Sequence, residues 1–272
     1  MPEVLGPVVA VTAAAWTYAV GMGRRSAAGR PAPAAEVTVY GTGLLTLLVV
    51  LLPPFEELAE RRLWAHMVQH VTIVAVAAPL LVLGNTSGVL TAGLPRSWRA
   101  RGPVAVQPSR FEDPARATVL AAVALVGHTG ALWAWHLPSL YEPALRSAPV
   151  HALEHASLFV TALFFWLVVA GSRRRAGSGA AVLVTFVAAL QGSALGALMT
   201  LAGSSWYPTY AKAATGGGLT PLEDQQVAGV VMWGPCGAIY TLAGVLLLAA
   251  WIRRSEREGR PAVSSVGWER SR

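Results

Sequence analysis

The sequence predicts an all-α, polytopic membrane protein, and its composition and the spacing of its apolar runs support this prediction. Of its 272 residues, 54% are hydrophobic and only 13% are charged, which is about half the charged share of an ordinary soluble domain. A soluble enzyme of this length would need a more charged surface, and a disordered chain would contain fewer hydrophobic residues. A single cysteine excludes an internal disulfide framework and any CxxC motif.

Seven apolar stretches approach or reach the length needed to cross a bilayer, which is about 17–25 helical residues. Arginines follow the first stretch instead of preceding it, so it does not resemble a signal peptide. We expect one transmembrane helical-bundle domain over residues 1–272. The predicted spans are residues 4–22, 37–52, 64–84, 117–135, 150–171, 180–202 and 226–252.

The distribution of lysine and arginine predicts the orientation of the bundle. The segments that follow the odd-numbered spans hold 17 of the 21 basic residues, whereas the other loops hold four. Because cytoplasmic segments carry the excess of lysine and arginine, we expect the N-terminus outside and the C-terminus in the cytoplasm. The basic residues form no groove with interleaved aromatic residues, so membrane lipids, and not nucleic acid, are the expected partners.

Two polar stretches lie outside the predicted spans and are cytoplasmic in this orientation. Residues 85–115 are rich in proline, glycine and arginine, which favours a flexible loop or one that includes a short surface helix. Residues 253–272 form a polar tail that we expect to be poorly ordered.

All six histidines are predicted to lie toward the extracytoplasmic side, where the third and fifth spans begin and the fourth ends. The first two are four residues apart, and so are the last two, which places each pair on one helix face about 40° apart. Two imidazoles one helical turn apart can bind a single metal, and ionisable groups within spans are usually functional. The six are His66, His70, His128, His136, His151 and His155.

Softer and acidic groups lie at a similar predicted depth. Met232 and Cys236 are four residues apart near the outer end of the seventh span, and sulfur together with imidazole suits copper, especially Cu(I). Simple packing is the alternative for both residues. Among the acidic residues expected on the outer side, Glu154 and Asp224 are assigned to the second shell, where a carboxylate fixes a histidine tautomer.

Two further features concern helix packing. Pro235 removes the hydrogen bond to the carbonyl of Val231 and can bend the seventh span. Ala188, Gly192 and Gly196 form a ridge of small residues on the sixth span, which predicts close packing of a neighbouring helix or a dimer face.

Several ordered motifs in this chain resemble the multi-span CtaG family, the assembly factors of caa(3)-type cytochrome c oxidases. The resemblance runs from about the second span to the seventh. The motifs are residues 66–70 (HMVQH), 78–84 (APLLVLG), 135–141 (WHLPSLY), 151–155 (HALEH), 207–210 (YPTY), 221–225 (PLEDQ) and 232–233 (MW).

The resemblance implies a multi-pass protein of the bacterial plasma membrane that is needed to make active haem–copper oxidase. We therefore expect a non-enzymatic metallochaperone that contacts cytochrome c oxidase subunits transiently and handles copper on the extracytoplasmic side. The expected main copper ligands are His66, His70, His151 and His155, with His128, His136, Met232 and Cys236 as secondary ligands.

Two other functions remain open from the sequence. Histidines on two helices can ligate a haem iron axially, which would make the protein an electron carrier or a haem-handling protein. His151, Glu154 and His155 also form the H-x-x-E-H string of inverted zinc peptidases. A zinc hydrolase would require a third ligand and a water-filled cleft in addition.

Overall fold

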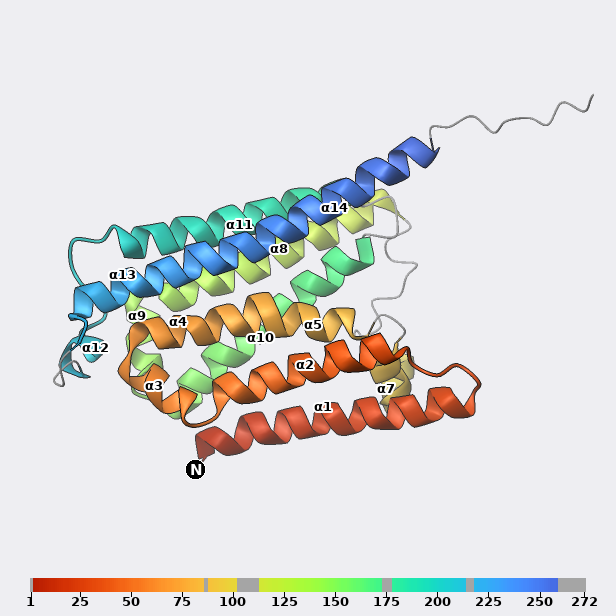
Figure 1. The fold of residues 1–272 in the computed structure, drawn as a ribbon, viewed down its shortest axis with the longest axis horizontal. Helices are drawn as coiled ribbons and strands as arrows, with labels where there is room; N and C mark the ends of the chain where they lie inside the picture. Colours follow the sequence, from red (N-terminus) through yellow and green to blue (C-terminus); the bar gives the residue numbers. More distant parts are fainter. Residues whose placement is uncertain (1, 86–87, 102–112, 173–177, 214–217, 259–272) are drawn as a thin grey trace, which may run out of the picture.

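The computed structural model is a bundle of long helices, most of which run roughly along one common direction (Figure 1). The structure describes residues 2–85, 88–101, 113–172, 178–213 and 218–258, and this part of the chain contains no β-strand. The all-α prediction is therefore confirmed for the described residues.

Seven helical segments are long and apolar enough to cross a membrane, which confirms the predicted number of spans. All seven agree with the predicted boundaries within about five residues, and the seventh extends beyond its predicted limits at both ends. The segments are Leu5–Ala27, Ala34–Leu51, Leu63–Leu83, Ala115–His136, Ala148–Gly171, Gly179–Thr200 and Pro221–Arg257.

Five spans are single helices, and short helices connect them at the ends of the bundle. The single-helix spans are α1 (Pro2–Ala27), α2 (Ala34–Leu51), α8 (Pro114–His136), α10 (Ala148–Ser172) and α11 (Ser178–Thr200). The short helices are α3 (Phe55–Arg61), α6 (Val89–Gly93), α7 (Arg96–Arg101), α9 (Pro138–Ala144) and α12 (Pro208–Ala213).

The third and seventh spans each contain a π-helical turn next to a proline. The third is α4 (Leu63–Val71), η1 (Thr72–Ala77) and α5 (Ala78–Leu83), and the seventh is α13 (Pro221–Val231), η3 (Met232–Cys236) and α14 (Gly237–Glu258). Pro235 lies inside η3, so the predicted interruption takes the form of a π-helical turn. In the third span, Trp166 Nε1 donates a hydrogen bond to the carbonyl of Val74 at 2.8 Å.

The third span is the most buried of the seven and occupies the centre of the bundle. Its residues Leu63, Met67 and Ile73 are each at most 1% exposed. The other spans expose many large apolar side chains on their outer faces, for example Trp16 on α1 and Leu190 on α11. In a membrane these faces contact lipid, whereas the central span is surrounded by protein.

The ridge of small residues on the sixth span is buried inside the bundle at all three of its positions, and its closest helix contact is at Gly196. A Cβ atom added at Gly196 would lie 2.8 Å from the carbonyl oxygen of Gly229 and 2.8 Å from the amide nitrogen of Trp233. The backbones of α11 and the seventh span therefore approach closely at this point. At Gly192 the nearest atom, on Leu132, would be 3.9 Å away, so Gly192 takes no part in this approach.

Part of the predicted 85–115 loop is folded against the first span. A Cβ atom at Gly21 of α1 would lie only 1.9 Å from the carbonyl oxygen of Val89 in α6. Arg24 Nη1 also donates to three carbonyl oxygens at the C-terminal end of α6 at 2.8–3.0 Å. Helix α7 is the surface helix that the sequence allowed for, while residues 102–112 lie outside the described part of the chain.

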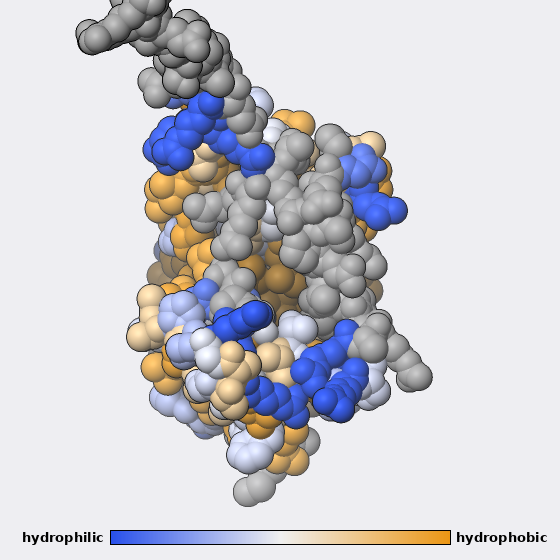
Figure 2. Space-filling view, turned by 90° about the vertical axis from the view of Figure 1, so that its right-hand side faces the viewer, coloured by the Kyte–Doolittle hydropathy of each residue, from blue (hydrophilic) through white to orange (hydrophobic). Residues whose placement is uncertain are grey.

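One end of the bundle carries most of the described arginines. Figure 2 looks at the end where α7 and the last turns of α14 lie, and hydrophilic groups are visible on it. This clustering agrees with the predicted cytoplasmic face, although the tail beyond residue 258 is not among the described residues. The described arginines at this end are Arg24, Arg25, Arg30, Arg96, Arg99, Arg116, Arg253, Arg254 and Arg257.

The predicted orientation can be tested with reporters at opposite ends of the bundle. A green fluorescent protein fused after Glu258 is expected to fluoresce, because this end should lie in the cytoplasm. Alkaline phosphatase inserted after Ser147, between α9 and α10, is expected to be active, since that loop should be outside. The reverse pair of activities would contradict the positive-inside assignment.

The close approach at Gly196 predicts a difference between two glycine substitutions on one helix. Gly196→Ala should destabilise the protein by roughly 1–3 kcal/mol, because the new methyl group meets backbone atoms that cannot move separately. Gly192→Ala is the matched control and should leave the thermal midpoint in detergent nearly unchanged. Equal midpoints for the two variants would show that the contact is not tight.

Candidate metal centre

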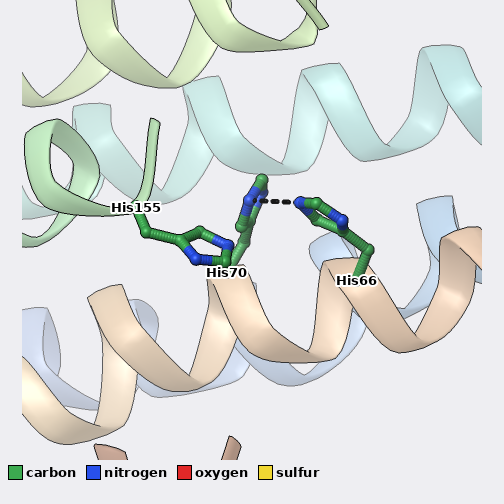
Figure 3. Close-up of side chains that lie close together, drawn as sticks. All are labelled: His66, His70 and His155. Atoms are coloured by element: carbon green, nitrogen blue, oxygen red, sulfur yellow. Dashed lines mark hydrogen bonds between the residues drawn. The ribbon is translucent and has the colours of Figure 1, made fainter. Parts of the chain in front are cut away.

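Four histidines from two helices converge at the end of the bundle opposite the arginine-rich end. His66 and His70 of α4 face His151 and His155 of α10. Ring centroids are 5.3 Å apart for His70 and His155 and 5.2 Å apart for His66 and His151. Figure 3 shows three of these rings pointing toward one another across the space between the two helices. The two i,i+4 pairs, which the sequence placed on separate helix faces, thus belong to one site.

Glu154 lies between these imidazoles and completes what we call the His–Glu cluster, which consists of His66, His70, His151, Glu154 and His155. Its carboxylate oxygens are 3.4 Å from Nε2 of His70 and 3.8 Å from Nε2 of His66. Two overlapping sets of ligand atoms in this cluster each lie within 4.8 Å of one another. The sets are His66, His70 and His155, and His66, His151 and Glu154.

The core of the cluster is removed from solvent. His66, His70 and Glu154 are 1%, 2% and 0% exposed. Among the described residues, neither oxygen of Glu154 has a hydrogen-bond partner, and Nδ1 of His70 and Nε2 of His155 also lack one. Buried polar atoms are nearly always hydrogen-bonded, so this group of exceptions in one place makes the cluster a candidate site for a cation.

Tyr210 determines which nitrogen of His66 is available to a ligand. The hydroxyl of Tyr210 donates to the carbonyl oxygen of Ala59 at 3.0 Å, and it also lies 3.2 Å from Nδ1 of His66. Because the hydroxyl proton is used on Ala59, Nδ1 of His66 carries the hydrogen and donates to Tyr210. Nε2 of His66 therefore presents its lone pair, and it faces Nε2 of His70 at 2.9 Å (Figure 3).

A second set of contacts holds the outer side of the cluster. Glu56 of α3 accepts a hydrogen bond from the side chain of Gln69, and its other oxygen lies 3.7 Å from Nδ1 of His151. Gln69 also donates to the carbonyl oxygen of Val50 at 2.7 Å. Helices α2, α3 and α4 are thus tied together beside the histidines. Polar partners behind ligands orient them and adjust their basicity.

Three tyrosines cover the cluster, namely Tyr141 of α9, Tyr210 of α12 and Tyr207, which directly precedes α12. The rings of Tyr141 and Tyr207 are 4.4 Å apart, and Tyr141 lies 5.3 Å from His66. Burial raises the pKa of Tyr141 and of Tyr210, so both hydroxyls keep their protons at neutral pH. The tyrosines therefore contribute hydroxyl groups and no negative charge to this side of the site.

Glu142 joins the short helices α9 and α12 beside these tyrosines. Its carboxylate accepts hydrogen bonds from the amide of Thr209 at 3.0 Å and from the hydroxyl of Thr209 at 2.7 Å, and it pairs with Arg146. Partial burial acts to raise the pKa of Glu142, but the bonds from Thr209 and Arg146 outweigh it and lower this pKa below its usual value. The carboxylate is therefore ionised at neutral pH, and its hydrogen bonds to Thr209 of α12 are kept.

Asp224 occupies a different position from the one predicted. Its two carboxylate oxygens accept hydrogen bonds from the amides of Leu63 and Trp64, both at 3.0 Å. These are the first amides of α4, whose own N-cap residue, Arg62, makes no side-chain capping bond. Asp224 therefore caps the helix that carries His66 and His70, and it positions these residues through the backbone.

The other predicted ligands lie outside the two sets of ligand atoms. Nε2 of His128 is 2.7 Å from the hydroxyl of Tyr240, and its ring stacks on Phe165 deeper in the bundle. Met232 and Cys236 belong to the π-helical turn of the seventh span. Cys236 is in neither set of close ligand atoms among the described residues, and Met232 is buried in the apolar core. Depth along a span had suggested them, but depth does not fix the direction of a side chain.

His136 is adjacent to the cluster without belonging to it. Its ring centroid is 5.7 Å from that of His70. Its Nδ1 bonds to the carbonyl oxygen of Leu132 at 2.7 Å, while Nε2 lies 3.2 Å from the sulfur of Met67. Met67 and Tyr210 belong to the motifs of residues 66–70 and 207–210, but a motif does not tell which side chains approach each other in space. Glu56 lies in the short helix α3, which has no motif of its own.

Comparison with known protein families gives one result. A family model described as cytochrome c oxidase caa3 assembly factor matches residues 16–254, a range that includes all seven spans in whole or in part and all six histidines. No curated protein and no solved structure matches the chain.

The capping role of Asp224 predicts a loss of stability on its removal. Asp224→Ala leaves two amides at the start of α4 without their acceptor, which should cost about 1–2 kcal/mol. Glu223→Ala is the comparison, because it removes an exposed capping-box contact with Thr220 at the start of α13, whereas Asp224 caps a buried helix. Thermal unfolding in detergent should show the larger decrease for Asp224→Ala, and the opposite order would contradict the assignment.

Proposed function

We propose that this chain, which belongs to the family of cytochrome c oxidase caa3 assembly factors, binds copper in the His–Glu cluster and delivers it to the oxidase. The proposal rests on one observation above all. Nε2 of His66 and Nε2 of His70 lie 2.9 Å apart in a buried space that also contains Glu154 and His155. A respiratory assembly factor has an evident use for such a site, because its client contains copper.

The spacing of the two nitrogens suits a shared metal ion. Bonds from imidazole nitrogen to zinc are about 2.0–2.1 Å long, and two bonds of this length at a right angle place the nitrogens about 2.9 Å apart. In the absence of an ion, the hydrogen on Nε2 of His70 points toward the lone pair on His66. An ion that binds here takes the place of this hydrogen, which moves to Nδ1 of His70, so a neutral imidazole binds the ion without net release of a proton. Binding weakens at low pH, because protonated imidazoles do not bind a metal.

The donor atoms favour a late transition metal. Imidazole nitrogen suits copper, zinc, iron and nickel, and for a given set of nitrogen and oxygen ligands the affinity is highest for Cu(II). Glu154 adds a negative charge that compensates part of the charge of a divalent ion. Family membership supports copper over zinc, since oxidase assembly requires copper.

The position of the cluster fits delivery on the outer side. It lies at the end opposite the arginine-rich end, which is the extracytoplasmic end in the predicted orientation. Within the cluster, the side chain of His151 is 16% exposed, whereas those of His66 and Glu154 are 1% and 0% exposed. We assign His151 as the ligand that first meets copper and last releases it.

The geometry is less suited to the other functions that the sequence left open. Two axial haem ligands bind on opposite faces of the macrocycle, so their nitrogens need a separation of about 4 Å, twice a metal–nitrogen bond. Across α4 and α10, the ring centroids of His66 and His151 are 5.2 Å apart and those of His70 and His155 are 5.3 Å apart, which is closer than two rings on opposite faces of a macrocycle would be. A hydrolase needs access for substrate and water, whereas Glu154 is fully buried.

Metal analysis of the detergent-purified protein tests the proposal. We expect close to one copper per chain after exposure to copper, with little zinc or iron, measured by mass spectrometry. The double variant His70→Ala, His155→Ala should lose this copper and should fail to mature cytochrome c oxidase in low-copper medium. Glu154→Gln keeps the shape of the side chain and should weaken copper binding by about 10–100-fold.

His128→Gln is the matched control for these variants. His128 is a buried histidine of the same bundle but bonds to Tyr240 outside the cluster, so its replacement should leave the copper content unchanged. Normal oxidase maturation in the double variant under copper limitation would refute copper delivery. Iron with a Soret band in the purified protein would favour the haem function instead.

A further inference from the structure

The contact between His136 and Met67 is the least expected polar contact in the bundle. Nε2 of His136, at the end of α8, lies 3.2 Å from the thioether sulfur of Met67 on α4. Both side chains are buried, with exposures of 2% and 0%. The backbone carbonyl of His136 also accepts a hydrogen bond from Tyr207 at 2.8 Å, which holds the end of α8 in place.

The hydrogen bond at Nδ1 of His136 implies that Nε2 of His136 and the sulfur of Met67 face each other with their lone pairs. The carbonyl oxygen of Leu132 can only accept, so Nδ1 of His136 carries the hydrogen and donates it at 2.7 Å. In the neutral imidazole, Nε2 is then an acceptor, and a thioether sulfur is also an acceptor. No hydrogen lies between them, and two acceptors in contact within a buried space gain nothing from each other. A cation between them would satisfy both.

We propose that His136 and Met67 form a nitrogen–sulfur subsite for monovalent copper beside the His–Glu cluster. Thioether sulfur with imidazole is a soft donor pair, and soft donors select Cu(I) over harder divalent ions. Metal bonds of about 2.0–2.1 Å to nitrogen and about 2.3 Å to sulfur add up to more than 4 Å. One ion can therefore touch both atoms at their separation of 3.2 Å.

The subsite is placed so that copper can pass between it and the cluster. Met67 lies in the same turn of α4 as His66 and His70, and His70 has His136 as a ring neighbour at 5.7 Å. His70 thus borders both donor sets. This inference rests on the proposed copper function, and it adds a second binding position with a different preference for oxidation state.

The test loads the detergent-purified full-length protein with Cu(I) under anaerobic conditions, up to two equivalents, followed by removal of loosely bound copper. X-ray absorption at the copper edge should show a sulfur neighbour at about 2.3 Å in the wild type. Met67→Leu, which conserves volume, should lose this sulfur signal and one of the two retained copper ions. His136→Gln should also reduce the retained Cu(I) from two ions to one.

Met22→Leu is the matched control, because Met22 lies on α1 next to Gly21 and close to Arg24, at the arginine-rich end of the bundle and away from the histidines. It should keep the sulfur signal. Copper retained in the wild type with nitrogen and oxygen neighbours only would overturn the subsite and leave the proposed function standing. A sulfur signal that persists in Met67→Leu would also overturn it. A wild type that retains no copper would refute both proposals.

Discussion

Every polar group that a membrane bundle buries must find its partner inside the protein, and this constraint governs the structure around the His–Glu cluster. Glu154 is the strongest case, since it is fully buried and neither of its oxygens accepts a hydrogen bond from a described residue. The imidazoles around it supply nitrogen atoms, of which that of His66 is held as an acceptor by Tyr210. A buried carboxylate without hydrogen-bond partners is unfavourable without a positive charge beside it, and a bound cation would stabilise Glu154 and the histidine nitrogens together.

The same constraint shapes the central span, which must keep its histidines aligned with those of α10. Asp224 from the seventh span satisfies the first amides of α4, so the start of the helix is fixed from a distant part of the chain. Farther along, the π-helical turn η1 precedes Pro79, and Trp166 of α10 donates to the carbonyl of Val74 within that turn. A π-helical turn changes which residues share a face. It therefore allows α4 and α5 to present different faces to the same neighbours.

The features that the sequence predicted are those that depend on local patterns. Run length gave seven spans, and the i,i+4 spacing gave two histidine pairs at one end of the bundle. Spacing along one helix carries no information about its rotation against another, so the meeting of α4 with α10 appears only in the structure. For the same reason, Cys236 had a suitable depth but lies outside the sets of ligand atoms, and Asp224 proved to be a helix cap. Tyr210 is part of a motif, but it is 144 residues from His66, and nothing in that motif predicted their contact.

The two donor sets differ in hardness, and this difference bears on how a carrier could release its metal. The His–Glu cluster combines nitrogen and oxygen donors and a negative charge, which stabilises a divalent ion. The pair of His136 and Met67 has no charge and contains a soft sulfur, which stabilises a monovalent ion. In the proposed carrier both positions would lie next to His70, so copper could move between them without any large movement of helices. Release would then be an exchange of one or two ligands at a time, in which a client ligand replaces the more exposed His151.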